Sequence, residues 1–180
     1  MRAGALTLLL FAFAAVARAD DPAVTVASVH DLATASARSW SDDARLVYVE
    51  NDAGVDARGH APRWGFLFFS AARDEARSYS LRDGEVDRAE TLSFDFDPPP
   101  LADAWIDSDA ALRRAEEEGG AAFRADHAAA LRTMLLTRGL MHLDEPDRTT
   151  WTCVYDAPGQ PSLWIVLDAR DGELLRRWKG

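Results

Sequence analysis

The chain has 180 residues, a formal net charge of −10, one cysteine and an apolar content of 48%. So acidic a chain repels phosphate groups, which argues against nucleic acid and anionic membrane surfaces as partners. Because Cys153 is alone, no intramolecular disulfide can form. The length fits one domain, or two small halves that share a core.

The N-terminus has the pattern of a secretory signal peptide. Met1-Arg2 gives a positive start, residues 5–16 form an apolar run, and Ala17-Arg18-Ala19 is a small-x-small cleavage sequence. This run is shorter than the roughly 20 residues that cross a bilayer, and no cysteine follows it to carry a lipid anchor. We predict a signal peptide over 1–19, cleaved after Ala19, and a secreted or periplasmic protein without stable membrane insertion. Cleavage would remove two arginines and no acid, giving a net charge of −12. A retained amphipathic anchor is the alternative.

The first part of the mature chain predicts one helix and several strands. Ser28 is expected to cap a helix over 29–40, which has an apolar stripe at helical spacing. Strands are expected over 45–50, 64–69, 75–81 and 86–96, and Asp83-Gly84 predicts a hairpin turn. Pro98-Pro99-Pro100 then neither continues a helix nor donates to a sheet. We therefore predict a first unit over 20–97 and a Pro-rich linker over 98–104.

The second part, residues 105–180, has the same order of signals. Asp107 or Ser108 is expected to cap a helix through Glu118, which Gly119-Gly120 would end. Residues 121–130 predict a further helical turn or two. Strands are expected over 131–137, 151–155 and 162–168, before a turn at Asp171-Gly172.

The two parts share a spaced motif. Trp64 lies 19 residues before Asp83-Gly84-Glu85, and Trp151 lies 20 residues before Asp171-Gly172-Glu173. Such a match at fixed spacing predicts one small unit used twice. The predicted fold class is α+β, with two helix-then-antiparallel-meander units that share a core.

Two predicted strands, 64–69 and 163–167, are apolar on both faces, whereas a half-exposed strand alternates with polar residues. One face would pack on the unit's own helix. We expect the sister unit to cover the other face, so that the two units form a two-layered body. The alternative cover is another chain or an apolar ligand.

Several features of the second unit point to a family. They are the helix 107–115 with Gly119-Gly120, the pattern Trp151-x-x-x-Tyr155, and the strand and turn over 163–174 with Asp168-Ala169 before the turn. In these features the chain resembles the PepSY-like domains, exported modules found in peptidase propeptides and in membrane or secreted proteins. The first unit, which lacks the Asp-Ala pair before its turn, would be a divergent copy. The resemblance implies a cystatin-like layout, in which a helix packs on a curled antiparallel sheet, and a role in binding.

The residues that could support catalysis form no recognisable site. Cys153 lies in an apolar strand, away from a helix N-terminus or a cation, so a buried thiol is favoured over a nucleophile. His30, His60, His127 and His142 are too scattered for a zinc site. Motifs for a nucleophile elbow, a P-loop, a dinucleotide fold or a metalloprotease are absent from the sequence. We predict no catalytic, cofactor-binding or metal-binding residues.

Acidic residues cluster at a few places. Residues 144–147 and the set Asp168, Asp171 and Glu173 offer oxygens that suit calcium, but neither forms the spaced loop of a calcium site. Turns and solvated acids therefore remain the favoured interpretation. Asp107 and Asp109 fit the start of a helix, and residues 116–118 predict a solvated face.

Taken together, the sequence predicts an exported, non-enzymatic PepSY-like binding module that regulates or inhibits a peptidase or binds another envelope protein. One alternative is a small-ligand-binding protein, or an enzyme, with a cavity between helix and curled sheet. Another is a structural envelope protein that assembles through strand edges.

Overall fold

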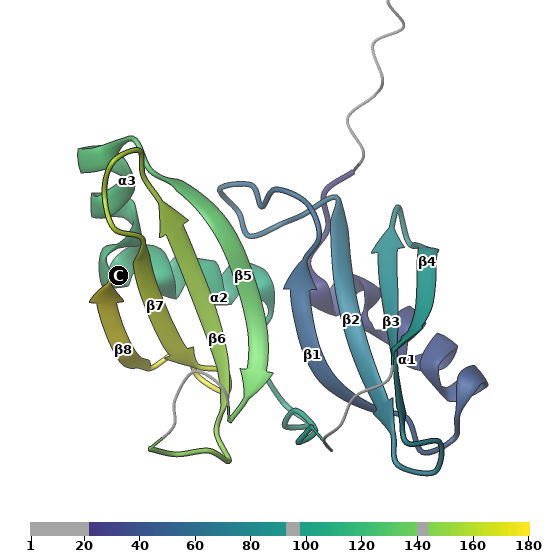
Figure 1. Cartoon of the computed structure of the whole chain (residues 1–180). Helices are drawn as coiled ribbons and strands as arrows, with labels where there is room; N and C mark the ends of the chain where they lie inside the picture. The colour runs from purple at the N-terminus through teal and green to yellow at the C-terminus, as the bar shows by residue number, and fades with distance from the viewer. Residues whose placement is uncertain (1–21, 93–97, 140–143) are drawn as a thin grey trace, which may run out of the picture.

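The structure of the protein is a computed structural model that describes residues 22–92, 98–139 and 144–180. The predicted signal peptide, the end of the predicted strand 86–96 and His142 lie outside these residues. Within them the chain is α+β, with helices on one face of an antiparallel sheet of eight strands (Figure 1). Among the described residues, no helix combines the length and the apolar character that a membrane crossing requires.

The elements follow each other in two series of a helical segment and four strands. The first series is α1 (Val26–Trp40), β1 (Arg45–Asn51), β2 (Arg63–Ser70), β3 (Glu75–Arg82) and β4 (Glu85–Leu92). The second is α2 (Ser108–Ala115), the kinked turn η1 (Glu116–Gly120), α3 (Ala121–His127), β5 (Ala130–Arg138), β6 (Thr149–Asp156), β7 (Leu163–Asp168) and β8 (Leu174–Lys179). Apart from 86–96, each strand range predicted above is confirmed to within two residues at either end.

The strands lie in the order β4-β3-β2-β1-β5-β6-β7-β8, so β4 and β8 form the two edges. In the middle, β1 pairs with β5 through Val49 with Leu136 and Glu50 with Leu135. The prediction of a two-layered body is therefore wrong. The two groups of strands join edge to edge in one sheet, so neither group covers the second face of the other (Figure 1).

The main core lies between the helices and the sheet and is continuous from β3 to β7. Trp64 and Trp151 are fully buried in it. The indole Nε1 of Trp64 donates to the carbonyl of Val24 at 2.9 Å, and that of Trp151 donates to the carbonyl of Ile106 at 2.8 Å. Each tryptophan thus holds the segment that leads into a helix, α1 or α2, while its ring fills the core. Both polar groups of these large side chains are satisfied, as burial requires.

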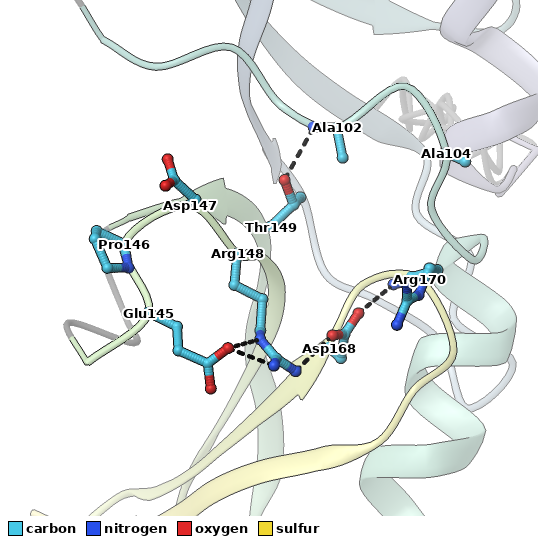
Figure 2. Close-up of a pocket in the computed structure, with 9 residues that line it drawn as sticks. All are labelled: Ala102, Ala104, Glu145, Pro146, Asp147, Arg148, Thr149, Asp168 and Arg170. Carbon is cyan, nitrogen blue, oxygen red and sulfur yellow. Dashed lines mark hydrogen bonds and ion pairs between the residues drawn. The ribbon is translucent and has the colours of Figure 1, made fainter.

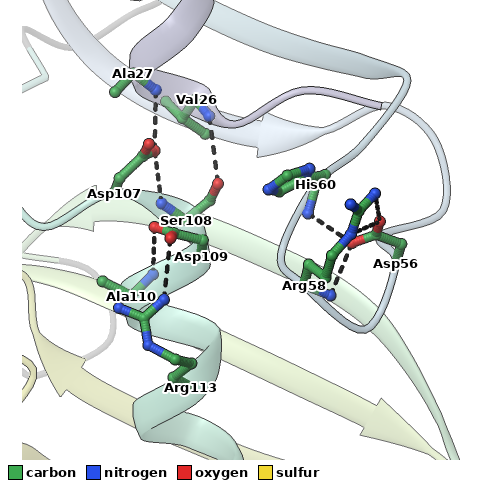
Figure 3. Close-up of polar contacts among 10 residues, drawn as sticks. All are labelled: Val26, Ala27, Asp56, Arg58, His60, Asp107, Ser108, Asp109, Ala110 and Arg113. Atoms are coloured by element: carbon green, nitrogen blue, oxygen red, sulfur yellow. Dashed lines mark hydrogen bonds and ion pairs between the residues drawn. The ribbon is translucent and has the colours of Figure 1, made fainter. Parts of the chain in front are cut away.

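The start of α1 differs from the prediction because its capping groups come from elsewhere in the chain (Figure 3). The helix begins at Val26, and the Ser28 hydroxyl donates to the carbonyl of Thr25 at 2.7 Å, so Ser28 is not the cap. Instead, Asp107 Oδ1 accepts from the backbone N–H of Ala27 at 3.0 Å and from that of Ser108 at 2.7 Å. The Ser108 hydroxyl also accepts from the N–H of Val26 at 3.3 Å. The N-cap of α2 therefore caps both helices.

The helix is broken at Gly119, whose φ of 120° is not helical, so the end predicted at Gly119-Gly120 is confirmed. A further helix, α3, follows within residues 121–130, as predicted. A Cβ on Gly120 would overlap the Tyr155 hydroxyl, so glycine permits this close contact. That hydroxyl donates to Glu116 Oε1 at 2.9 Å, and Arg124 donates to Glu116 Oε2 at 2.8 Å. Glu116 is thus a paired, largely buried carboxylate, which corrects its assignment to a solvated face.

Residues 98–107, which lead into α2, form no helix or strand but are held by hydrogen bonds. The N–H of Leu101 donates to the carbonyl of Leu46 at 2.8 Å, and that of Ile106 donates to the carbonyl of Ala169 at 2.7 Å. Ala102 donates its N–H to the Thr149 hydroxyl at 2.9 Å. Residues 98–107 therefore contact strands of both series.

Candidate binding groove on the uncovered sheet face

The sheet face opposite the helices carries two adjoining clefts that share Tyr48 and Leu67, and we call them together the sheet groove. The first cleft, of about 490 Å³, has Val47, Tyr48 and Leu67 on its strand side and Pro98, Pro99 and Pro146 among its walls. The second cleft, of about 340 Å³, extends over β1 to β4 and contains Glu50, Asp52, Arg88 and Glu90. The groove thus has a charged end and a mainly apolar end, which also contains the ion pair of Arg138 and Asp147; we call these the charged end and the apolar end.

An irregularity in β1 shapes the apolar end. Leu46 pairs with Phe68 and Tyr48 pairs with Leu67, so β1 has one extra residue, Val47, between these pairs. Such a bulge places two consecutive side chains on one face and bends the strand. Val47 consequently packs with Phe69 and Ala76 in a small second hydrophobic cluster, against which Tyr48 and Leu67 lie.

Tyr48 is held as a neutral phenol. Its hydroxyl donates a short hydrogen bond to Glu50 Oε2. Burial raises the pKa of Tyr48 far above its ordinary value, and the bond to the Glu50 carboxylate raises it further. The phenol therefore does not supply a base or a nucleophile at physiological pH. It offers an apolar ring to the groove.

At the charged end, the side chains are already engaged with each other. The Ser80 hydroxyl donates to Asp52 Oδ2 at 2.6 Å, and Arg88 lies 3.7 Å from Glu90. A Cβ on Gly65 would lie 2.8 Å from Asp52 Oδ1, so the glycine leaves room for this carboxylate above β2. The charged end therefore offers hydrogen-bond acceptors.

A third cleft, of about 500 Å³, adjoins the groove through Pro146 and Asp147 (Figure 2). Arg148 occupies it between two carboxylates: its Nε donates to Glu145 Oε2 at 2.7 Å and its Nη1 to Asp168 Oδ2 at 2.8 Å. Asp168 Oδ1 also accepts from the N–H of Arg170 at 2.8 Å. These ion pairs join the start of β6 to the end of β7, and they engage one carboxylate from each of the two acidic sets considered for calcium. No three potential metal ligands come together among the described residues.

The candidate nucleophile is sealed in the core. Cys153 is fully buried on β6, and burial raises the pKa of its thiol far above the ordinary range. His30 packs edge-on against Trp105 with 5.5 Å between ring centroids, and His127 packs against Phe123 at 4.8 Å. The N–H of His60 donates to Asp56 in a loop.

On the helix side, a cleft of about 530 Å³ lies beside α1 and residues 100–105. His30, Phe68 and Trp105 supply aromatic surface there, and Arg38 is one of the cationic side chains that line it. Among these clefts of the described residues, this one lies closest in position to the predicted cavity between helix and sheet.

Three threonine hydroxyls on the uncovered side of β5 and β6 are buried without a hydrogen-bond partner among the described residues: those of Thr137, Thr150 and Thr152. Thr137 and Thr150 face each other across the two strands. A buried hydroxyl without a partner costs stability, so each of these threonines is expected to destabilise the sheet.

The chain has few similarities to known proteins. No protein family matches it in sequence, and no curated protein matches it either. A crystal structure from Clostridium difficile 630, described as a "putative lipoprotein", has a similar fold, with a TM-score of 0.60 and 14% sequence identity. The match covers 84% of this chain and 92% of that protein. At this identity the similarity shows the fold alone.

Proposed function

We propose that the protein is an exported, non-enzymatic binding module that holds a segment of a peptidase or of another envelope protein in the sheet groove. In this proposal residues 20–97 and 105–180 are two PepSY-like, cystatin-like units, joined by 98–104. The repeated order of one helical segment and four strands supports the duplication. The signal-peptide pattern over 1–19 supports export.

The observation that carries the proposal is the sheet groove itself. Its apolar floor of Val47, Tyr48 and Leu67 lies on the face that no described helix covers. Apolar surface in a concave site bordered by a few polar groups is typical of binding sites. Neighbouring strands lie about 4.8 Å apart, so a ligand that crosses from β4 to β5 spans about 19 Å, or about six extended residues. The groove therefore suits an extended polypeptide segment.

The chemistry of the side chains supports binding over catalysis. Tyr48 stays protonated, Cys153 is sealed in the core, and the carboxylate of Asp52 accepts from Ser80. None of these groups is placed as an activated nucleophile with an adjacent base.

Site-specific photo-crosslinking tests the proposal. A photoreactive amino acid in place of Leu67 should capture an exported polypeptide, while the same amino acid in place of Arg113, on the exposed side of α2, should not. Pro99→Asp should abolish the capture, because it puts a charge into the apolar wall while leaving the strands unchanged. Equal capture from both positions would contradict the assignment to the groove.

Incubation with the exported peptidases of the same organism tests the regulatory form of the proposal. We expect one activity to change on addition of the protein and to return with Pro99→Asp. If every activity stays unchanged, the partner is another envelope protein or the regulatory form is wrong. Circular dichroism should show that the variant is folded.

A second candidate function is small-ligand binding in the helix-side cleft. The aromatic surface of His30, Phe68 and Trp105 in a cleft of about 530 Å³ favours it. Native mass spectrometry distinguishes the two. A bound small molecule that Trp105→Ala removes would support this candidate, and a ligand-free mass together with capture at position 67 would exclude it.

A further inference from the structure

The edge strand β8 concentrates positive charge in an otherwise acidic protein. Three of the four residues 176–179 are cations, namely Arg176, Arg177 and Lys179, and all three are exposed. The remaining residue is Trp178. The rest of the mature chain is acidic enough to bring its expected net charge to −12. The strand is therefore a local exception to the charge of the whole molecule.

These three cations have no carboxylate partner among the described residues. Arg176 lies over the ring of Trp178 at 4.7 Å, Lys179 lies 5.0 Å from the centre of the Phe123 ring, and Arg177 donates to the carbonyl of Glu118. Most described arginines do form ion pairs with carboxylates. Positive charge on β8 thus remains available to a partner.

The backbone of β8 is also available. Ser162 and Gly180 exchange two hydrogen bonds of 3.1 Å, which sets the alternation along the β7–β8 pair. Trp178 and Arg176 then direct their N–H and C=O groups at β7, opposite Trp164 and Val166. Arg177 and Lys179 direct theirs outward. Because β8 is the last strand of the sheet, these outward groups can pair with an added strand.

We propose that β8 binds an extended acidic polypeptide segment, which adds to the sheet as a further strand. Arg177 and Lys179 lie two residues apart, so both side chains lie on the helix side of the sheet, where Arg177 reaches Glu118 and Lys179 reaches Phe123. The matching segment carries acidic residues at alternate positions. Main-chain bonds hold the added strand and the charges select its sequence.

A separate partner fits this edge better than a second copy of the chain. The other edge, β4, is exposed along its length and contains Glu85, Asp87 and Glu90. However, Asp87 lies 3.4 Å from Arg63 and Glu90 lies 3.7 Å from Arg88, so both carboxylates already have partners. Two copies would in addition bring two strongly negative molecules together. A short acidic segment meets neither obstacle.

Fluorescence anisotropy with a labelled peptide tests this inference. The probe is acetyl-Thr-Glu-Val-Glu-Thr-amide, and its control has Gln in place of both Glu residues. We expect the acidic peptide to bind at least fivefold more tightly, with an affinity that falls as salt rises. Equal affinities for the two peptides would overturn the proposal.

Variants of β8 make the test specific. Lys179→Gln should raise the dissociation constant about two- to fivefold, the value expected for one cross-strand charge pair. Lys179→Pro, which also removes an outward N–H, should raise it about tenfold. Arg132→Gln is the matched control, because Arg132 is an exposed strand arginine that already pairs with Asp156 at 3.7 Å, and it should leave binding unchanged. If Lys179→Pro fails to fold, the result with Lys179→Gln decides.

Two further measurements distinguish binding at β8 from binding in the sheet groove and from self-association. Pro99→Asp, in the sheet groove, should not change peptide binding, so this inference can fail or hold independently of the proposed function. Light scattering should show a monomer. If the peptide does not bind while the protein forms oligomers that Lys179→Gln dissolves, the edge belongs to a second copy and the proposal is overturned.

Discussion

Asp107 supports the start of two helices, and its removal should therefore cost more than the loss of an ordinary cap. Asp107→Ala deletes the acceptor for the N–H of Ser108 at 2.7 Å and for that of Ala27 at 3.0 Å. One N-cap contributes about 0.5–2 kcal/mol, so two give at most about 4 kcal/mol. Because Ala27 is exposed and water can reach its N–H, we expect a loss of about 2 kcal/mol.

Urea unfolding followed by tryptophan fluorescence measures this loss as a change in the free energy of unfolding. For a chain of this length, about 2 kcal/mol corresponds to a fall in Tm of about 4–8 °C. Asp107→Asn keeps a side-chain oxygen in the same place and should lose much less. Asp109→Ala is the matched control, because Asp109 lies in the first turn of α2 and bonds only within that helix, to Ala110 and Arg113.

The comparison between Asp107→Ala and Asp109→Ala decides the question. If both variants lose the same free energy of unfolding, Asp107 does not stabilise α1 and the shared cap is refuted. Far-ultraviolet circular dichroism provides a second readout, since only Asp107→Ala should fray α1.

Three other predictions concern buried groups and pH. Thr152→Val should raise the free energy of unfolding by about 1 kcal/mol, because the buried hydroxyl has no partner among the described residues. Thr149→Val should lower the free energy of unfolding, because it removes the acceptor for the N–H of Ala102. Urea unfolding of both variants checks this. Hydrogen bonds, first from the Ser70 hydroxyl and then from the N–H of Ala72, lower the pKa of Asp43 to about 2. Its stabilising effect is therefore complete above its ordinary pKa near 4 and is lost as pH falls to about 2, so unfolding at a series of pH values should show a shallower acid loss for Asp43→Asn. Iodoacetamide should label Cys153 slowly in the native protein and quickly in denaturant, and fast native labelling would contradict its burial.

Most strands were predictable here because their signals are local, although β8 was not predicted. The run 64–69 is apolar at every position but Gly65, and its turn partner Asp83-Gly84 is a strong hairpin signal. Both give the same boundaries in the structure to within a residue or two. The apolar second face of 64–69 was also visible in the sequence. The sequence did not show that the two groups of strands join edge to edge, which leaves that face without a helix. This joining depends on the pairing of β1 with β5, two segments that are far apart in the chain.

The groove and the cap of α1 depend on groups that no local pattern connects. Tyr48 and Leu67 meet because of a bulge at Val47, which the sequence of β1 does not mark. Asp107 reaches Ala27 from 80 residues away, so a search for a cap beside α1 finds Ser28 instead. Glu116 was assigned to a solvated face because its partners, Tyr155 and Arg124, lie beyond the helix that contains it.

The cations of β8 were visible in the sequence as Arg176, Arg177 and Lys179. Their significance was hidden, because composition does not show which charges are paired. A search for like charges at alternate positions of the segment after Asp171-Gly172 would have found Arg177 and Lys179.

The shared cap at Asp107 and Ser108 also sets an order of events as the chain is made. Helix α1 begins at Val26, yet the groups that satisfy its first N–H groups are synthesised about 80 residues later. Helices of this length are marginal in water when isolated, and contacts of such long sequence separation form slowly. A nascent chain that ends before residue 107 should therefore leave α1 only partly formed, and the completed protein should gain it late, together with α2.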